Sequence, residues 1–515
     1  MSKYIKGTDK NQLNMIPMAL DEMISEDNPV RVIDALVDSL DMKSLEFKYA
    51  NPKKYGRKPY DPKDLLKLYI YGYFNGIRTT RKLEKEANRN IEVMWLLNNL
   101  KPDDKTISNF RKDNNNKALT NVFKQFSMLC DELGLYVKEI IAVDGSKFRA
   151  SNSRRKNMTK RKVKKVIEYY ENKAKEYLEL LDHTELENEK SSKIELSKTE
   201  INEKIKTIKT KIKEFTKMAE EIEENGELSI TDPDSRHMGV SNNGTYIAHN
   251  VQTAVNAKHH LVVAVDVVSC PADQTQLHNI TKKAIDALEL NEDNKTSKDK
   301  ELITVLADKG YYSGVELLKC KQDNIKTIVP KQKGSTPKSG NKLYLKDNFI
   351  YDKNSDTYTC PQGQILSNVS KATSKEKAYR NSKVCFKCEF KNECTSAKRG
   401  KAIIRGPYQN IYDEVNKITA KNKELYRQRQ MIVEHPFGTV KRTLGFSYFL
   451  TRGNTNVKAE SFMHFFTYNL IRTINIIGVK ELVEILKAKI MLSYCKILKN
   501  IKISLNIRIL LPTNG

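Results

Sequence analysis

Two apolar runs far apart in the chain each lead into an aspartate, and together they constrain the fold more than any other feature. The first is VKEIIAVDGSKF, from Val137 to Phe148, in which Asp144 precedes Gly145. The second is LITVLADK, from Leu302 to Lys309, which closes around Asp308. Short apolar runs that stop at a polar residue are typical of buried strands. We therefore predict two core strands, each with a carboxylate at its carboxyl end.

The remaining strand signals predict a mixed sheet. Tyr246–Val255 and His260–Val268 alternate or run apolar and predict a strand pair, and Ile325–Val329 predicts another short strand. A helical pattern covers Gln274–Leu288. Strands interleaved with helices indicate an α/β fold with a mixed sheet flanked by helices. Because Asp-Gly also occurs in hairpin turns, a turn at Asp144 is the alternative for the first run.

A long charged segment separates the first core strand from the rest. From 154 to 227 the composition shifts to Lys, Glu and isolated aliphatic residues. One apolar seam runs from Val163 to Leu181, and a second, at alternating spacings of four and three, from Ile201 to Ile222. Two such seams predict an antiparallel helical hairpin inserted in the core, or a coiled coil with a partner chain. We expect no catalytic residue in it.

The N-terminal region, 1–135, has the pattern of short helices. Pro62 follows an extended basic stretch and suits a first helical turn. Helical stripes then alternate with Ser, Thr and Asp caps, with Arg81 and Arg111 beside them. This pattern is compatible with a helix-turn-helix-like DNA-binding unit, with simple helix packing as the alternative.

The charge of the chain favours a polyanionic partner. Its 515 residues include 90 Lys and Arg against 64 Asp and Glu, a net charge of +26. Nucleic acid is the first candidate, ahead of an anionic membrane surface. We find no signal peptide and no apolar run long enough to span a bilayer. Eight cysteines in so long a chain do not indicate a disulfide scaffold, so we expect a reducing cytoplasm.

Four of these cysteines are grouped in a loop-rich stretch, 332–406. They form a Cys-Pro-x-Gly turn, a C-x2-C pair and a single residue soon after, namely Cys360, Cys385, Cys388 and Cys394. Four thiols in this pattern predict tetrahedral zinc or a redox-labile cluster, with free cysteines as an equal alternative.

A helix from 426 to 441 supplies a third acid. On a regular helix Arg427, Met431, Glu434, Gly438 and Lys441 fall on one face, which puts one carboxylate between two cations. Such a face suits a metal with phosphates on either side, although a solvated helix face is the simpler alternative.

Asp144, Asp308 and Glu434 together could hold two divalent ions at one edge of the sheet. Paired ions activate an attacking oxygen and stabilise the leaving oxygen in a displacement at phosphorus. Carboxylate ligands favour Mg²⁺, with Mn²⁺ as a substitute. We rank Asp266 and Asp273 below Asp308 as site residues, because the apolar run before Asp308 ends at the acid.

The order of these acids and the residues around them resemble the DDE transposases of bacterial insertion sequences. The closest branch is the IS-eleven-eighty-two group, related to IS-four-like enzymes. The resemblance runs from about Gly56 to Arg472 and rests on ADKGYYS around Asp308, VEHPFGTVKR around Glu434, PYDPKDLLKLYIYGYFNGIRTTRKLE, TDPDSR, HNVQTAV, the cysteine motifs and Tyr468-Asn469-Leu470.

The resemblance implies an RNase H-like core in which Asp144, Asp308 and Glu434 bind metal. It implies DNA transposition by metal-dependent cleavage and strand transfer at terminal inverted repeats, with double-stranded DNA as partner and a homodimer in the synaptic complex. Lys441 keeps the family's lysine position seven residues after the glutamate, whereas Gln430 and Arg427 stand where the family has arginine and tyrosine. The DNA-contacting candidates are Lys441, Arg427, Arg429, Arg442, Arg81 and Arg111.

The predicted organisation is therefore a helical DNA-binding domain, a split catalytic core and two insertions. The segments are 1–135 (DNA binding), 136–153 and 228–331 (core), 154–227 (hairpin), 332–406 (cysteine insert), 407–476 (catalytic helices) and 477–515 (helical tail). We expect a bacterial, cytoplasmic protein associated with the nucleoid. A nuclease that cuts without rejoining and a non-catalytic DNA-binding protein from a decayed element are the alternatives.

Overall fold

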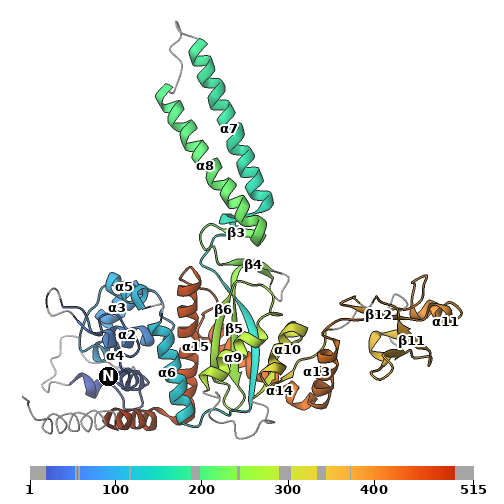
Figure 1. Cartoon of the computed structure of the whole chain (residues 1–515). Helices are drawn as coiled ribbons and strands as arrows, with labels where there is room; N and C mark the ends of the chain where they lie inside the picture. The colour runs from blue at the N-terminus through green and yellow to red at the C-terminus, as the bar shows by residue number, and fades with distance from the viewer. Residues whose placement is uncertain are drawn as a thin grey trace, which may run out of the picture.

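The computed structural model describes residues 19–52, 55, 58–114, 117–186, 198–239, 244–288, 303–332, 344–371 and 373–492. Figure 1 shows a central sheet with N-terminal helices on one side, a small β module on the other and a long helical hairpin projecting from one end. Among the described helices, none combines the length and the apolar character needed to cross a membrane.

The N-terminal part is a cluster of short helices. They are η1 (Leu20–Met23), α1 (Val30–Asp38), α2 (Pro62–Phe74), α3 (Thr80–Arg89), α4 (Ile91–Leu96), α5 (Asp104–Asn114) and α6 (Ala118–Glu132). Helix α2 begins at Pro62, which needs no hydrogen-bonded N–H there, and the Asp61 carboxylate accepts from the N–H of Lys63. The side chain of Asn90 caps α4 in the same way.

The central sheet is mixed, as predicted. Its strands are β1 (Ile140–Arg149), β4 (Arg236–Gly239), β5 (Thr245–Asn256), β6 (Val262–Val268), β7 (Ile303–Leu306) and β8 (Ile325–Ile328). The order is β4-β5-β1-β7-β8, and β6 also pairs with β5. Strand β5 is antiparallel to β1, whereas β7 and β8 run parallel to it. Because β1 has partners on both sides, Ile141, Ala142 and Val143 are fully buried.

The prediction that the first strand ends at Asp144 is wrong. Strand β1 continues through Gly145 to Arg149, and β5 pairs with it along almost its whole length. The Asp-Gly hairpin turn is wrong for the same reason. The parallel neighbour β7 stops earlier, so Asp144 lies in mid-strand at the point where one edge of β1 becomes free.

Helices pack against this sheet from several parts of the chain. They are α9 (Leu277–Ala287), α10 (Gly314–Gln322), α13 (Gln409–Lys421), α14 (Lys423–Gly438) and α15 (Asn454–Ile477), with a short η4 (Lys309–Tyr311) and a π-helical turn η7 (Thr439–Thr443). Helix α14 packs on β1 and β5, and α15 lies between β6 and α6. Asn469 of α15 bonds both the N–H and the carbonyl of Val262, which ties the helix to the start of β6.

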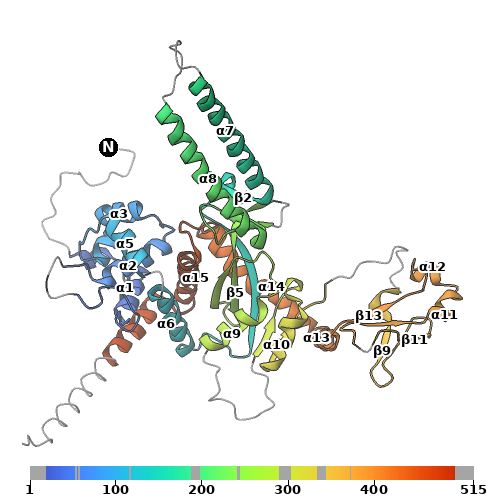
Figure 2. The same cartoon turned by 45° about the horizontal axis from the view of Figure 1, so that its top comes forward.

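The charged segment forms two long helices, α7 (Lys160–Leu186) and α8 (Lys198–Asn225), which run side by side away from the sheet (Figures 1 and 2). A short ladder of β2 (Asn157–Thr159) and β3 (Glu227–Ser229) joins their bases. Aliphatic residues of both predicted seams are buried between them, among them Val163, Ile201 and Ile222. Residues 187–197 lie outside the described part of the chain.

The cysteine-containing stretch folds into a small antiparallel sheet with two short helices (Figure 2). Its elements are η6 (Lys346–Asn348), β9 (Ile350–Asp352), β10 (Thr357–Thr359), β11 (Ile365–Asn368), β12 (Lys377–Arg380), α11 (Ser382–Phe386), α12 (Lys391–Cys394) and β13 (Ile403–Arg405). Of the predicted helical tail, residues 479–492 are helical, and 493–515 lie outside the described residues.

Candidate active site

The register of the central sheet brings Asp144 and Asp308 together. Ala142 of β1 pairs in parallel with Leu306, the last residue of β7. Asp144 comes two residues after Ala142, and Asp308 comes two residues after Leu306. The two aspartates therefore lie at matching positions on neighbouring segments of the chain. Neighbouring strands are about 4.8 Å apart. The sheet therefore holds together two acids that are far apart in the sequence.

Asp308 is fixed by the turn that follows it. Its carboxylate caps η4 and accepts from the N–H of Gly310 at 2.7 Å. A Cβ atom on Gly310 would lie 2.9 Å from the Asp308 Oδ1, which is closer than ordinary packing allows. Glycine at 310 thus permits the cap and holds the orientation of the carboxylate.

Asp144 is a carboxyl group that burial discourages from ionising. Burial raises its pKa to about 6; Arg429 acts to lower it, and Asp308 raises it further. The N–H of Gly145 donates to Asp144 and opposes the rise, and Asp273 adds to it. A positive ligand beside the two aspartates would relieve this unfavourable charge.

Arg429 approaches the site from α14. Its Nη1 lies 3.9 Å from Asp144 Oδ1, too far for a direct hydrogen bond. The same Nη1 is buried without a hydrogen-bond partner. A buried guanidinium N–H lacking an acceptor is costly, and it marks a position where an anionic ligand atom would be favoured.

Glu434 lies on the same helix but away from the aspartates' immediate surroundings. It is exposed, and its carboxylate accepts from Gln430 one turn earlier at 2.8 Å. Glu434 is five positions after Arg429 in the sequence. On a regular helix this spacing places the two side chains about 140° apart around the helix axis. Among the described residues, no group of three or more His, Cys, Asp and Glu side chains stands close enough together to hold a metal ion as it is.

Lys441 does not share the exposed helix face that the spacing predicts. Helix α14 ends at Gly438, and the π-helical turn η7 follows. A π turn is wider than an α turn and changes the direction of the next side chains. Lys441 therefore points at β1, where its Nζ donates to Ser146 Oγ at 2.6 Å and to the carbonyl of Lys147 at 2.7 Å.

The burial of Lys441 also changes its acidity. Burial lowers its pKa to about 8, the nearby Lys147 lowers it further, and Asp144 opposes the shift. The ammonium lies 4.3 Å from the centre of the Phe148 ring. Asp144, Ser146 and Phe148 alternate along β1 and so share one face of the sheet, the face that α14 and η7 cover.

A polar network that sequence reasoning missed lies against the next residues of β1. Asp273 Oδ1 accepts from Lys147, Asn250 and Gln252 at 3.1, 2.7 and 2.8 Å. Gln252 Oε1 in turn accepts from the buried Tyr311 hydroxyl. Asp273, which we ranked below Asp308 as a site residue, thus takes part in the polar network beside β1. The alternation of Asn250 and Gln252 within the apolar strand is the signal that could have indicated it.

The other acid ranked with it lies elsewhere. Asp266 is held by Lys283 and Lys458. Its pairing is consistent with a structural role.

The remaining predicted DNA contacts differ in accessibility. Arg81 is 89% exposed and pairs loosely with Asp104, and Arg442 is exposed. Arg427 is 73% exposed and pairs with Glu424. Arg111 is partly buried; burial acts to lower its pKa, but the nearby Tyr69, Tyr73 and Glu460 side chains raise it overall. Its guanidinium faces the protein rather than a surface.

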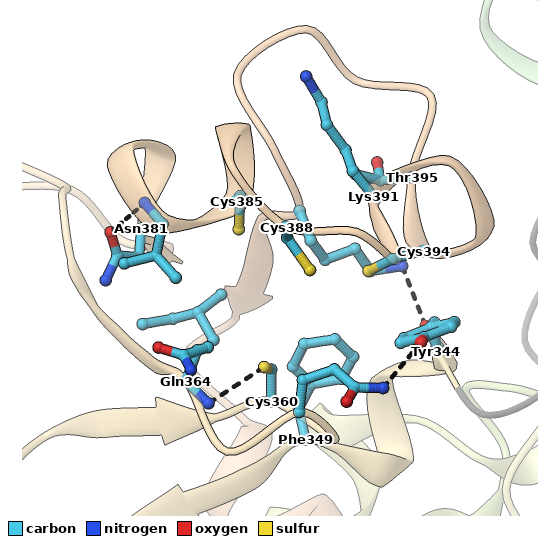
Figure 3. A pocket seen from close by; sticks show the side chains of 14 residues that line it. Tyr344, Phe349, Cys360, Gln364, Asn381, Cys385, Cys388, Lys391, Cys394 and Thr395 are labelled. Carbon is cyan, nitrogen blue, oxygen red and sulfur yellow. Dashed lines mark hydrogen bonds between the residues drawn. The ribbon is translucent and has the colours of Figure 1, made fainter.

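The four predicted cysteines lie around one cavity of the small β module. Cys360, Cys385, Cys388 and Cys394 all line it (Figure 3). The described cysteines, including these four, are free thiols rather than disulfides.

Comparisons with known proteins bear on this arrangement. A family model described as "Transposase domain (DUF772)" matches residues 18–113, the N-terminal helical cluster. A second, described as "Transposase DDE domain", matches residues 359–474, which include the four cysteines, Arg429 and Glu434. Two stretches of this chain thus match transposase family models.

The two transposase matches support a DDE transposase, and they do not reach the narrower insertion-sequence group. Neither match includes Asp144 or Asp308. No curated protein matches the chain. Among solved structures, one similar chain is from "Cryo-EM structure of piggyBac transposase synaptic complex with hairpin DNA (SNHP)", at 7% identity and a TM-score of 0.31, covering 95% of this chain and 83% of that one. A likeness of that degree does not establish a shared fold.

Proposed function

We propose that this protein is a DNA transposase that cleaves and joins strands by metal-dependent phosphoryl transfer at Asp144 and Asp308. The observation that carries the proposal is the parallel pairing of β1 with β7, which supports a shared site because Asp144 and Asp308 each follow the paired residues Ala142 and Leu306 by two positions. The transposase domains on either side of this sheet support the same function. The mixed sheet and its helices are compatible with the RNase H-like core that the resemblance implies.

The acids fit a divalent cation. Two adjacent carboxylates, one with its pKa raised to about 6, would be stabilised by a bound positive charge. Oxygen ligands favour Mg²⁺, with Mn²⁺ as a substitute, and two ions would suit an in-line displacement. Bound there, the metal would activate the attacking oxygen and polarise the phosphate. Glu434 is the proposed third ligand, brought from the exposed face of α14.

The basic residues around the acids would bind and orient DNA. Arg429 Nη1 has no acceptor of its own, so a phosphate oxygen near Asp144 would complete its hydrogen bonding. Lys441 holds β1 beside Asp144 through Ser146, and a phosphate could replace that bond. Arg81, Arg427 and Arg442 lie at the surface and would contact the backbone of the DNA further away.

The partner we propose is double-stranded DNA carrying the terminal inverted repeats of an insertion sequence, together with target DNA. The net charge of +26 supports a polyanionic partner. Transposition requires two ends to be held at once, so we propose a homodimer in the synaptic complex. The narrower assignment to the IS-eleven-eighty-two group, with action at the bacterial nucleoid, belongs to this proposal.

A plasmid assay tests the function. A donor plasmid carrying the element's ends is incubated with the protein, Mg²⁺ and a target plasmid. Joined products are expected from the wild type and none from Asp308→Asn or Glu434→Gln, whereas Asp286→Asn, an exposed aspartate on α9, should behave as wild type. Nicks without joining would indicate a nuclease, and DNA binding without cleavage a non-catalytic protein.

A further inference from the structure

The small β module has too few buried residues to hold itself together well. Its sheet runs β13-β12-β11-β10-β9, and among the described residues its hydrophobic cluster consists of five buried side chains: Phe349, Tyr358, Leu366, Tyr379 and Ile403. Small folds with so little core usually need a disulfide or a metal to stabilise them. Among the described residues the cysteines are free, so their thiols are available to a metal.

The four thiols converge on one cavity from two sides. Cys360 follows β10 in the Cys-Pro-x-Gly turn, and the other three come from α11, α12 and the turn between them. Figure 3 shows the four sulfur atoms directed into the space between these elements. The cavity has a volume of about 40 Å³, enough for an ion.

The backbone around the thiols is arranged to keep them there. The N–H of Gln364 donates to Cys360 Sγ at 3.3 Å, and the N–H of Gly363 donates to the Cys360 carbonyl. Gly400 has a φ of +83° and passes so close to Cys385 that a Cβ atom would lie 2.4 Å from the cysteine's own Cβ. An N–H that donates to a ligand atom is the usual outer contact of a metal-binding residue.

We propose that Cys360, Cys385, Cys388 and Cys394 bind one Zn²⁺ ion as a structural site that stabilises the β9–β13 module. This goes beyond the proposed transposition chemistry and uses none of its residues. Four thiolates with a C-x2-C pair are a ligand set that zinc prefers, and four protein ligands leave no open position for catalysis.

Binding would close the cavity. The thiols surround it without standing at ligand distances from a common point. Zinc would therefore draw α11, α12 and the β10–β11 turn together. Lys391 and Lys401 also line the cavity, and their charges would offset the negative charge of a four-thiolate site.

The zinc site would also stabilise the connection between β13 of the module and helix α13. Strand β13 leads directly into α13, and Arg405 at its end donates to the Tyr358 hydroxyl at 3.0 Å. The same guanidinium donates to Asp413 at 3.0 Å and to Asn410 at 2.5 Å, both on α13. Order in the module would thus reach α13 through Arg405.

The experiment is elemental analysis of the full chain purified under reducing conditions without chelator. We expect about one zinc per chain in the wild type. Zinc should be lost from Cys385→Ser and Cys388→Ser and retained by Cys270→Ser, a partly buried cysteine outside the module. Asp308→Asn should keep its zinc, so a failure of the transposase proposal would leave this result unchanged.

Two further measurements remain informative if a cysteine variant fails to fold. Cobalt exchanged into the wild type should give the thiolate charge-transfer and visible bands of a tetrahedral site. Chelation of the wild type should speed proteolysis within 344–405, and added zinc should reverse it. Folded wild-type protein without zinc, a Cys385–Cys388 disulfide, or proteolysis unaffected by chelator would overturn the proposal.

Discussion

Asp144 is kept at a cost to stability, which is a common sign of function. Its carboxyl is held in a buried strand beside Asp308, and its pKa is raised to about 6 from an ordinary 3.8. A group whose pKa is raised on folding binds protons more tightly in the folded state. Its ionisation therefore destabilises the protein as the pH rises from about 4 to above 6.

Replacing Asp144 by Asn should stabilise the metal-free protein at neutral pH while abolishing strand cleavage. The gain should be on the order of 2 kcal/mol at about pH 7.5 and small near pH 4, because the wild-type carboxyl is protonated there in both states. Urea unfolding of both proteins in chelator at the two pH values measures it. A variant that gains nothing as the pH rises would contradict the electrostatic explanation.

Gly145 is required because the polar network occupies the space where its side chain would be. A Cβ atom there would lie 2.2 Å from Gln252 Nε2 and 2.7 Å from Asp273 Oδ1. Gly145→Ala should therefore lose roughly 1–3 kcal/mol of unfolding free energy and reduce cleavage, since the network must move.

The matched control for Gly145→Ala is Gly239→Ala. Gly239 also lies in a strand of the central sheet, and a Cβ atom there would meet nothing within 4 Å. Thermal unfolding of the two variants should separate them by several degrees. Equal unfolding temperatures of the two variants would mean that the polar network can move at little energetic cost and does not position β1.

At the scale of elements, apolar runs predicted the strands better than they predicted where the strands end. The apolar run before Asp308 matches a strand end closely, because β7 ends at Leu306, two residues before the acid. The apolar run before Asp144 predicted the end of β1 wrongly, because β5 continues to pair with β1 past Gly145. Strand ends depend on a partner strand, which a single segment does not reveal.

Helix α14 and the turn after it show the same limit. A regular helix predicted Lys441 on the face of Glu434, but η7 turns it toward Ser146. That change arises from the π-helical turn and from packing on β1. Asp144, Asp308 and Arg429 could be chosen as candidates from the sequence, whereas the bonds of Asp273 with Asn250 and Gln252 depend on which strands are neighbours.

A buried ion pair joins the N-terminal helices to the core. Arg78, between α2 and α3, donates to the Tyr448 carbonyl at 2.7 Å and lies 3.3 Å from Glu460 of α15. Its guanidinium also stacks on Phe446 and Tyr448. Glu460 further accepts from the N–H groups of Leu450 and Thr451. One side chain thus links the N-terminal cluster to the sheet's covering helix.

Arg78→Met should destabilise the protein by roughly 3–5 kcal/mol, because Glu460 would stay charged and buried without its cation. The side chain of Arg78 is 6% exposed, and that of Glu460 is 2% exposed. Arg81→Met, three residues away at 89% exposure, should change stability by less than about 0.5 kcal/mol. Chemical denaturation measures the free energy of unfolding of both variants. A similar loss of unfolding free energy in the two would argue against a special role for Arg78.

At the scale of the whole molecule, the net charge of +26 should make the proposed DNA binding sensitive to salt. If the protein neutralises several phosphates, its affinity for duplex DNA should fall roughly 10³-fold or more between about 50 and 200 mM salt. Fluorescence anisotropy with a labelled duplex measures the slope. Replacing the exposed Arg442 by Gln should reduce the slope of log affinity against log salt concentration by about one. A slope near zero for the wild type would exclude a mainly electrostatic interface.

The α7–α8 hairpin enters and leaves the central fold at one place, the three-residue ladder that pairs Asn157 with Ser229. The length between those residues is therefore independent of the register that aligns Asp144 with Asp308. Whole turns could be added to or removed from both helices without shifting the sheet. The reach of this arm could therefore change without altering the geometry of the two aspartates.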